Sequence, residues 1–238
     1  MLDPNSVKQA LAKAFQRADT SAQPLHERLA SYLTGSRAVL PELEATYDER
    51  VERLAEESRA ESLVPEIGQR LPTFRMRDTA GGVVELKSLL KQGPLVISFN
   101  RGPWCDYCGL ELHALARCYP EIVAAGGEAI SVVPETREFA SILKETRNVP
   151  FKVATDVDLS YARSLGLVFA VGDKIKQMYE EFGLDLARFQ GNDGWMLPIP
   201  ATLVVGADGL VRARHVDPDF RHRMDMETIL QAIQADGV

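Results

Sequence analysis

The chain has 238 residues, of which 45% are hydrophobic and 7% aromatic, a composition that excludes a disordered protein and allows one substantial core. Its formal net charge of −7 disfavours nucleic acid or an anionic membrane as a partner, because both are bound by clustered lysines and arginines. The sequence shows no signal peptide and no apolar run near the roughly 18 residues of a membrane span, so we expect a cytoplasmic protein.

Residues 1–65 are predicted to form an α-helical extension. Three apolar stripes with helical spacing begin near Val7, Leu25 and Leu40, and Gly35 is expected to end the second helix. Helices of this length are not stable alone, so they must pack on one another, on the rest of the chain or on a second subunit. The last of these possibilities predicts a homodimer.

Residues 66–238 change to alternating strands and helices, which predicts one α/β domain. A βαβ crossover followed by a hairpin and a closing helix is typical of an α/β sandwich with a mixed central sheet. The pattern predicts strands at 74–77, 83–86, 94–100, 128–133, 151–154, 201–205 and 210–214, a helix after 105, further helices at 136–147, 158–165, 172–182 and 224–235, and a polar loop at 190–194.

Cys105 and Cys108 lie where the apolar strand at 94–100 is expected to turn into a helix. The unpaired amides and the positive dipole end of a helix N-terminus favour an anion, so a thiol at this position is shifted toward thiolate. A thiolate with a second thiol within reach can open and close a disulfide. The motif therefore predicts a redox pair whose disulfide joins Cys105 to Cys108.

A zinc site is the main alternative for a Cys-x-x-Cys motif. A closed zinc site needs four ligands, usually with a second paired motif. The nearby candidates, Cys118 and His113, come from the same predicted helix. Cys118 is expected to pack as a small hydrophobe, and His113 to lie on the surface. We therefore predict neither a metal ion nor a bound cofactor.

The order of elements and the residues around the cysteines resemble the thioredoxin fold. More specifically, they resemble the Cys-x-x-Cys-containing, peroxiredoxin-like branch of the alkyl hydroperoxide reductase and thiol-specific antioxidant family, over roughly residues 66–236. In the peroxiredoxin register, Cys108 takes the peroxidatic position and Cys105 replaces the catalytic threonine. Glu111 matches an acidic residue that is common in that family.

Three positions depart from the peroxiredoxin pattern, and one of them is Cys105, which has no hydroxyl group to hydrogen-bond a peroxide. Arg101 stands where the family has its catalytic proline, and Pro200 stands where it has the arginine that steadies the thiolate. Arg101 is nevertheless a nearby positive charge and is expected to support the thiolate. No site is assigned to the basic segment 212–223, whose charges are expected to lie on the surface.

The same residues are similar to thioredoxin in a second register. Trp104 completes a Trp-Cys-x-x-Cys motif and could lie over the thiols, and Pro200 matches the cis-proline that faces them. In this register Cys105 attacks and Cys108 resolves. The two registers disagree about which sulfur attacks first, and the residues alone leave that choice open.

The resemblance implies a thiol-dependent oxidoreductase that reduces hydrogen peroxide or organic hydroperoxides. Its cycle would pass between a Cys105/Cys108 dithiol and a disulfide, and thioredoxin or a low-molecular-weight thiol would regenerate the dithiol. Two alternatives are a thioredoxin-like reductase of protein disulfides and an inactive thioredoxin-fold module that binds a partner through its helical extension.

Overall fold

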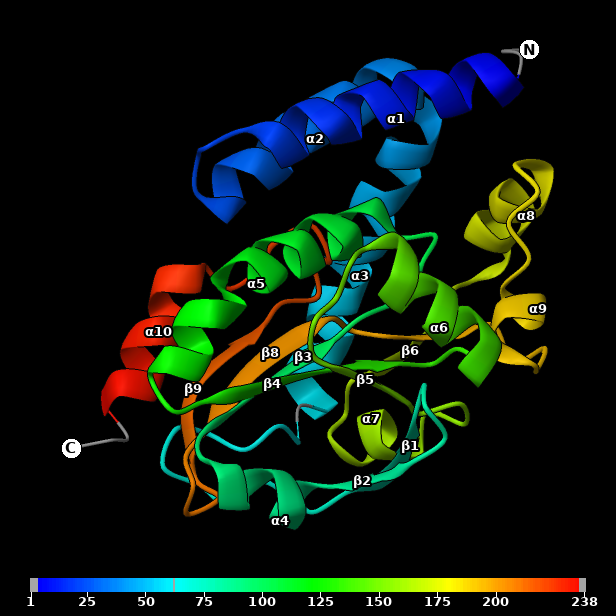
Figure 1. The fold of residues 1–238 in the computed structure, drawn as a ribbon. Coiled ribbons are helices and arrows are strands. Elements are labelled where there is room, and N and C mark those ends of the chain that lie inside the picture. The colour runs from blue at the N-terminus through cyan, green and yellow to red at the C-terminus, as the bar shows by residue number, and fades with distance from the viewer. Residues whose placement is uncertain (1–3, 62, 236–238) are drawn as a thin grey trace.

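A seven-stranded mixed sheet forms the centre of the molecule (Figure 1). The computed structural model describes residues 4–61 and 63–235. The strands are β1 (Arg75–Asp78), β2 (Val83–Glu85), β3 (Leu95–Phe99), β4 (Glu128–Val133), β5 (Lys152–Thr155), β6 (Val168–Ala170), β7 (Met196–Pro198), β8 (Ala201–Val205) and β9 (Val211–Val216). The sheet order is β2-β1-β5-β4-β3-β8-β9, and β6 and β7 pair separately. The three middle strands β5, β4 and β3 are parallel, whereas the outer pairings are antiparallel.

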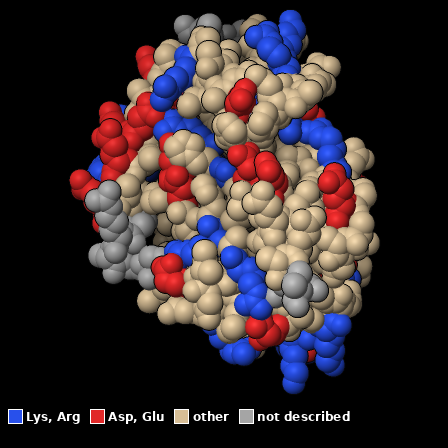
Figure 2. Space-filling model, turned by 90° about the vertical axis from the view of Figure 1, so that its left-hand side faces the viewer, with Lys and Arg blue, Asp and Glu red and all other residues tan. Residues whose placement is uncertain are grey.

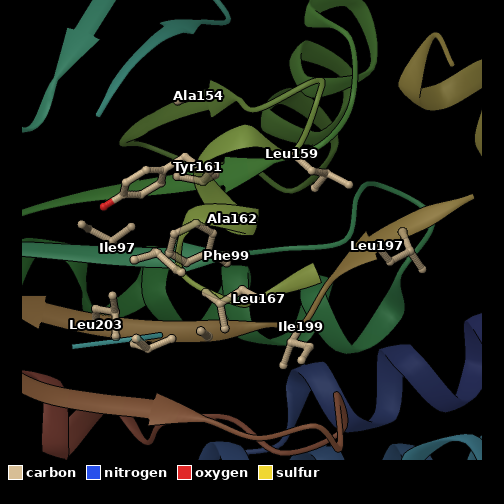
Figure 3. Close-up of a cluster of buried hydrophobic side chains, with 14 of the residues drawn as sticks. Ile97, Phe99, Ala154, Leu159, Tyr161, Ala162, Leu167, Leu197, Ile199 and Leu203 are labelled. Atoms are coloured by element: carbon tan, nitrogen blue, oxygen red, sulfur yellow. The ribbon is translucent and has the colours of Figure 1, made fainter. Parts of the chain in front are cut away.

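Helices cover both faces of this sheet. They are α4 (Leu86–Leu89), the 3-10 helix η1 (Leu90–Gln92), α5 (Asp106–Ala124), α6 (Arg137–Thr146), α7 (Ser160–Ser164), α8 (Asp173–Glu181), α9 (Leu186–Gln190) and α10 (Met226–Gln234). One face packs against α5, α6 and α10 through a cluster that includes Val96, Leu112 and Ile233. On the other face, Figure 3 shows Ile97, Phe99 and Tyr161 within a second cluster, where Phe99 stacks on Tyr161. This arrangement confirms the predicted thioredoxin-like α/β sandwich.

The sequence pattern located most of these elements, including the hairpin, the cysteine-bearing helix and the closing helix. It did not indicate α4, η1, β6, β7 or α9, because elements of three to five residues show too little periodicity to be recognised. Gln190, expected in a loop, is the last residue of α9.

The strand that leads to the cysteines is buried along its whole length. All five residues of β3 are buried because helices cover both faces of the sheet at its centre, so the strand is continuously apolar except at Ser98. The chain then turns through residues 100–105 into α5. Gly102 has φ 131°, and a Cβ atom there would lie 1.7 Å from the Glu135 carboxyl oxygen Oε1. Only glycine fits this turn.

The N-terminal segment forms three helices, α1 (Pro4–Thr20), α2 (Leu25–Val39) and α3 (Pro41–Glu61). Figure 1 shows α1 and α2 as an outer layer over α5. The expected end of the second helix at Gly35 is wrong, since α2 continues to Val39. A Cβ atom at Gly35 would lie 2.7 Å from the Ala14 Cβ atom, so this glycine allows α1 and α2 to approach closely. The predicted domain boundary at residue 65 stays a prediction.

The helical extension packs on the cysteine end of α5. Leu29 and Tyr32 of α2 share one buried cluster with Cys105 and Cys108. His113 of α5, expected on the surface, is half-buried because its Nδ1 atom lies 2.9 Å from the Asp19 carboxylate of α1. Part of the apolar surface of the extension is therefore covered within the chain itself.

Charges of both signs are distributed over the surface. Figure 2 shows basic and acidic side chains interspersed on one face of the molecule. Among the helices of the described residues, none is long and apolar enough to cross a membrane.

Candidate active site

The two cysteines lie at the N-terminus of α5, as the sequence predicts. Cys105 is the N-cap residue, and its Sγ atom accepts a hydrogen bond from the Cys108 backbone N–H at 3.3 Å. The Sγ atom of Cys108 accepts one from the Arg101 backbone N–H at 3.4 Å. Both cysteines are buried and free. The site therefore holds a dithiol with a backbone donor directed at each sulfur.

The Arg101 side chain lies against the first of these sulfurs. Its Nη2 atom is 3.5 Å from the Sγ atom of Cys105, and its guanidinium carbon is 3.7 Å from the ring centroid of Phe220. Arg101 is only 3% exposed. In the part of the chain that the structure describes, no carboxylate forms an ion pair with this guanidinium, so the Cys105 thiolate is its counter-ion.

A second buried arginine, Arg223, lies against the Cys108 sulfur. The sequence pattern did not indicate it. Arg223 places Nη2 3.6 Å from the Sγ atom of Cys108, and its Nε atom donates to Glu111 at 2.7 Å. The other Glu111 oxygen accepts from Thr202 at 2.8 Å and from Ser98 at 3.1 Å. The expectation that all charges of 212–223 lie on the surface is wrong at Arg221 and at Arg223, which are both buried because the chain between β9 and α10 turns back toward the site and the helical extension. Arg223 supplies the charge that Pro200 cannot.

These charges, together with burial, give the two thiols very different pKa values. Burial opposes ionisation of Cys105, but the hydrogen bond from the Cys108 thiol and the charges of Arg101 and Arg223 outweigh it and lower the pKa of Cys105 to about 5. Burial and the neighbouring Cys105 thiolate raise the pKa of Cys108 well above its usual range. At neutral pH the pair therefore holds one thiolate, on Cys105, and one thiol, on Cys108.

We expect a titration of thiolate absorbance at 240 nm to show this single low-pH ionisation. Because the pKa of Cys105 is lowered to about 5, the absorbance of the reduced protein should rise with a midpoint near that pH. The Cys105→Ser variant should lose this step, whereas Cys118→Ser should keep it, because burial and nearby Glu121 raise the pKa of Cys118 to about 11. A first midpoint above pH 8 would contradict the assignment.

The structure places the remaining predicted site residues as follows. Trp104 is half-buried, with its ring 5.2 Å from the Arg101 guanidinium. Pro200 is buried just before β8, where Ala201 pairs with Phe99. The expected cis-proline is wrong, because no peptide bond among the described residues is cis. The peptide bond before Pro200 is therefore trans, and the Ile199 N–H donates to the Leu167 carbonyl at 2.8 Å.

A cavity of about 280 Å³ opens beside Cys105. Its walls come from the helical extension, α8 and the turn at 100–105, and Arg101, Trp104 and Cys105 line it. Apolar and aromatic side chains form most of the remaining wall, among them Leu11, Leu43, Tyr47, Phe182 and Phe220. Cys108 is 0% exposed and does not line the cavity, so a molecule bound there would meet Cys105 first.

A buried carboxyl group lies behind the turn that carries the cysteines. Glu135 is 0% exposed, and no ion pair reaches it within residues 4–61 and 63–235. Burial raises the pKa of Glu135 well above its usual range, so the fold favours the neutral, protonated form of this carboxyl group. Its contact with Gly102 means that ionisation would place a charge directly against the active-site turn.

We expect Glu135→Gln to gain stability relative to the wild type as pH rises. An acid whose pKa is raised by folding stabilises the native state fully below its unfolded pKa, and this contribution falls as pH increases above that value. The difference in unfolding free energy between variant and wild type, from urea melts, should therefore grow steadily in favour of the variant between pH 4.5 and pH 8. Glu145→Gln, at an exposed position of α6, is the control and should show no such growth. A difference independent of pH would refute the buried neutral carboxyl.

Comparison with known proteins decides the family. The model of the AhpC/TSA family matches residues 67–214. The chain belongs to the AhpC/TSA family. This confirms the resemblance drawn from the cysteine motif and the predicted class of enzyme, a thiol peroxidase. The helical extension and Arg223 both lie outside the part of the chain that the AhpC/TSA model matches.

Solved structures of peroxiredoxins share the fold. Peroxidoxin BcpB from Mycobacterium tuberculosis is 16% identical with a TM-score of 0.56, over 71% of this chain and 97% of that one. Reduced Prx3 from Vibrio vulnificus, in complex with hydrogen peroxide, is 18% identical with a TM-score of 0.56, over 71% and 99%. Peroxiredoxin 6 of Arenicola marina is 16% identical with a TM-score of 0.55, over 71% and 72%. No curated protein matches the chain.

Proposed function

We propose that this protein reduces hydrogen peroxide or organic hydroperoxides, with Cys105 as the attacking thiolate and Cys108 as the resolving thiol. One observation carries the assignment: Cys105 lines the cavity with Arg101 against its sulfur, whereas Cys108 lies behind it. Access and charge thus favour the same sulfur. Among the two registers that the sequence allows, these features support the thioredoxin-like order of attack on a peroxiredoxin-like fold.

The first step forms a sulfenic acid. The Cys105 thiolate attacks one peroxide oxygen, the O–O bond breaks, and the second oxygen leaves with the electron pair and takes a proton from water. Negative charge develops on that leaving oxygen, and donors already in place stabilise it best. The Arg101 guanidinium lines the same cavity as the attacking sulfur, so it is the candidate donor.

The second step closes the disulfide. The Cys108 sulfur attacks the sulfenic sulfur of Cys105, an S–S bond forms, and the hydroxyl group leaves with the Cys108 proton as water. Cys108 follows Cys105 by one helical turn, so its sulfur is already close. Arg223 and the Arg101 backbone N–H stabilise negative charge as it develops on the Cys108 sulfur.

Regeneration, assembly and location complete the proposal. Thioredoxin or a low-molecular-weight thiol would return the disulfide to the dithiol. We also propose a cytoplasmic location, which the small number of cysteines, three in 238 residues, supports. We also propose a homodimer, and sedimentation velocity at micromolar concentration tests it: a clean monomer would remove this part.

The reaction class is tested by comparing two activities of the same purified protein. With dithiothreitol as reductant, we expect catalytic consumption of hydrogen peroxide and cumene hydroperoxide. Insulin-disulfide reduction should stay at the level of dithiothreitol alone, because the buried cysteines cannot reach a protein disulfide. Insulin reduction without hydroperoxide consumption would instead make the protein a disulfide reductase, and neither activity would favour the binding module.

A further inference from the structure

We propose that the cavity beside Cys105 admits a low-molecular-weight thiol as reductant, and that the helical extension excludes thioredoxin and other protein thiols. This inference rests on the proposed function, because it concerns the return of the same Cys105–Cys108 disulfide to the dithiol. It decides between the two classes of reductant that the family resemblance leaves open.

The extension lies directly over the first turn of α5. The Tyr32 hydroxyl donates to the Asp106 carboxylate at 2.7 Å, and its ring packs edge-on against Tyr107 with 5.0 Å between centroids. These two partners are the residues between the cysteines. From α3, Tyr47 packs edge-on against Phe220 at 5.1 Å, and Phe220 in turn lies on Arg101. The approach to both sulfurs is thus covered by side chains of the extension.

Charged contacts hold this layer in place at two separate points. At the end of α1, Asp19 pairs with Arg28 at 2.7 Å, with His113 at 2.9 Å and with Arg117 at 3.0 Å. The last two belong to α5, so the extension is tied to the helix that carries the cysteines.

The second attachment involves α3. Arg221 reaches Asp48 at 2.6 Å and Glu44 at 3.5 Å. The Tyr47 hydroxyl also donates to the Tyr179 hydroxyl of α8 at 2.7 Å. Several contacts from different helices would therefore have to break together before the extension could move off the cysteines.

A protein thiol cannot reach the disulfide through this layer. Thiol exchange requires the attacking sulfur to contact a disulfide sulfur directly. A cysteine on a partner protein extends by only one side chain from its surface, whereas a helix with its side chains is about 10 Å thick. With Cys105 3% exposed and Cys108 0% exposed, the partner surface would stop outside the extension.

A small thiol has a route that a protein lacks. The cavity of about 280 Å³ is near the lower end of small-molecule sites, so it holds one compact molecule. Exposed Lys8 is among its lining residues and marks where the cavity reaches the surface. Arg101 and Cys105, which are both buried, line the same cavity. An entering thiolate would therefore be attracted toward the Cys105 sulfur.

The exchange balances with two small thiols. The first thiolate attacks the Sγ atom of Cys105, the S–S bond breaks, and Cys108 leaves as a thiolate that takes the proton released by the incoming thiol. A second thiolate attacks the small-molecule sulfur of the mixed disulfide and releases Cys105 as a thiolate. The products are the dithiol and one oxidised small-molecule disulfide.

The test compares reductants on the full-length protein after its disulfide has been formed with diamide, which oxidises a dithiol without any peroxidase step. Recovery of the two thiols is followed by alkylation and intact mass, with dithiothreitol, glutathione, or thioredoxin with its reductase and NADPH. We expect dithiothreitol and glutathione to restore both thiols. Thioredoxin should have a smaller second-order rate constant than dithiothreitol, while reducing insulin normally in the same assay.

A variant that loosens the extension provides the second arm. Tyr32→Ala removes the ring over Tyr107, and we expect the thioredoxin rate constant to rise at least about tenfold while that of dithiothreitol changes less than about threefold. Lys13→Ala, at an exposed position of α1, is the matched control. If Tyr32→Ala fails to fold, Phe15→Ala is used in its place, because it removes a ring that packs edge-on against Tyr32.

Two outcomes overturn the inference. One is a wild-type disulfide that thioredoxin reduces faster than dithiothreitol does, and the other is a cysteine pair that diamide does not oxidise to the disulfide. Failure of the proposed function is a separate result, since a protein that consumes no hydroperoxide can still be compared with the two kinds of reductant in this assay.

Discussion

Cys105→Ser is expected to reduce hydroperoxide consumption to less than about 1% of the wild-type rate, because it removes the only thiolate that faces the cavity. Cys108→Ser is expected to keep the first step and lose the second. In the absence of reductant it should consume one equivalent of hydroperoxide and accumulate a sulfenic acid on Cys105 that dimedone traps. Stopped-flow fluorescence and intact mass measure both outcomes.

Cys118→Ser is the control for these two variants. Cys118 packs in the apolar cluster between α5 and the sheet, away from the cavity, so its replacement should leave activity unchanged. The reverse pattern, in which Cys105→Ser still consumes one equivalent and Cys108→Ser does not, would put the attack at Cys108. The peroxiredoxin register would then describe the chemistry as well as the fold.

Arg101→Met is expected to raise the pKa of Cys105 and to slow the reaction at neutral pH. A guanidinium about 4 Å from a thiolate attracts it by about 4 kcal/mol at an effective dielectric constant of 20, and 1.36 kcal/mol corresponds to one pH unit. Loss of this attraction moves the titration of Cys105 upward toward that of an ordinary thiol. The rate with hydroperoxide should fall about tenfold at pH 7 and recover in part at pH 9.

The pH profile distinguishes this electrostatic role from a structural one. A variant that merely disturbs the site would lose activity equally at both pH values. Arg75→Met, on an exposed residue of β1, is the matched control and should keep both the rate and the profile. An unchanged thiolate titration in Arg101→Met would refute the role given to this arginine.

The fold could be predicted from the sequence because its central elements are locally distinctive. The buried run of β3, the Cys-x-x-Cys motif and the amphipathic α5 follow one another directly, and together they specify a strand, a turn and a helix. The short elements between Val168 and Pro198 lack such periodicity. Their positions depend on tertiary contacts that a single sequence does not display.

The candidate site could be predicted only where its residues are adjacent in sequence. Arg101, Cys105 and Cys108 lie within eight residues of one another, so the motif identifies them together. Arg223 lies 115 residues beyond Cys108, in a segment whose several arginines look alike. Its pairing with buried Glu111 depends on how the chain returns between β9 and α10. Glu111, an acidic residue three positions after Cys108, is the one signal in the sequence that could have indicated a basic partner near the cysteines.

The role of the extension also depends on long-range tertiary contacts, which the sequence alone does not display. An amphipathic stripe shows that a helix must cover its apolar face, but it does not show what covers it. The structure places Tyr32 over Asp106 and Tyr107, so the extension is part of the active-site environment. This also explains how a Cys-x-x-Cys pair with a thioredoxin-like order of attack can be closed to large substrates.

Peptide mass spectrometry after exposure of the reduced wild-type protein to one equivalent of hydroperoxide tests the central claim most directly. The account predicts the loss of two hydrogens per chain, a peptide in which Cys105 is joined to Cys108, and a Cys118 that still reacts with an alkylating reagent. A protein whose Cys105 and Cys108 both remain alkylatable, or whose Cys105 forms its disulfide with another cysteine, would contradict it.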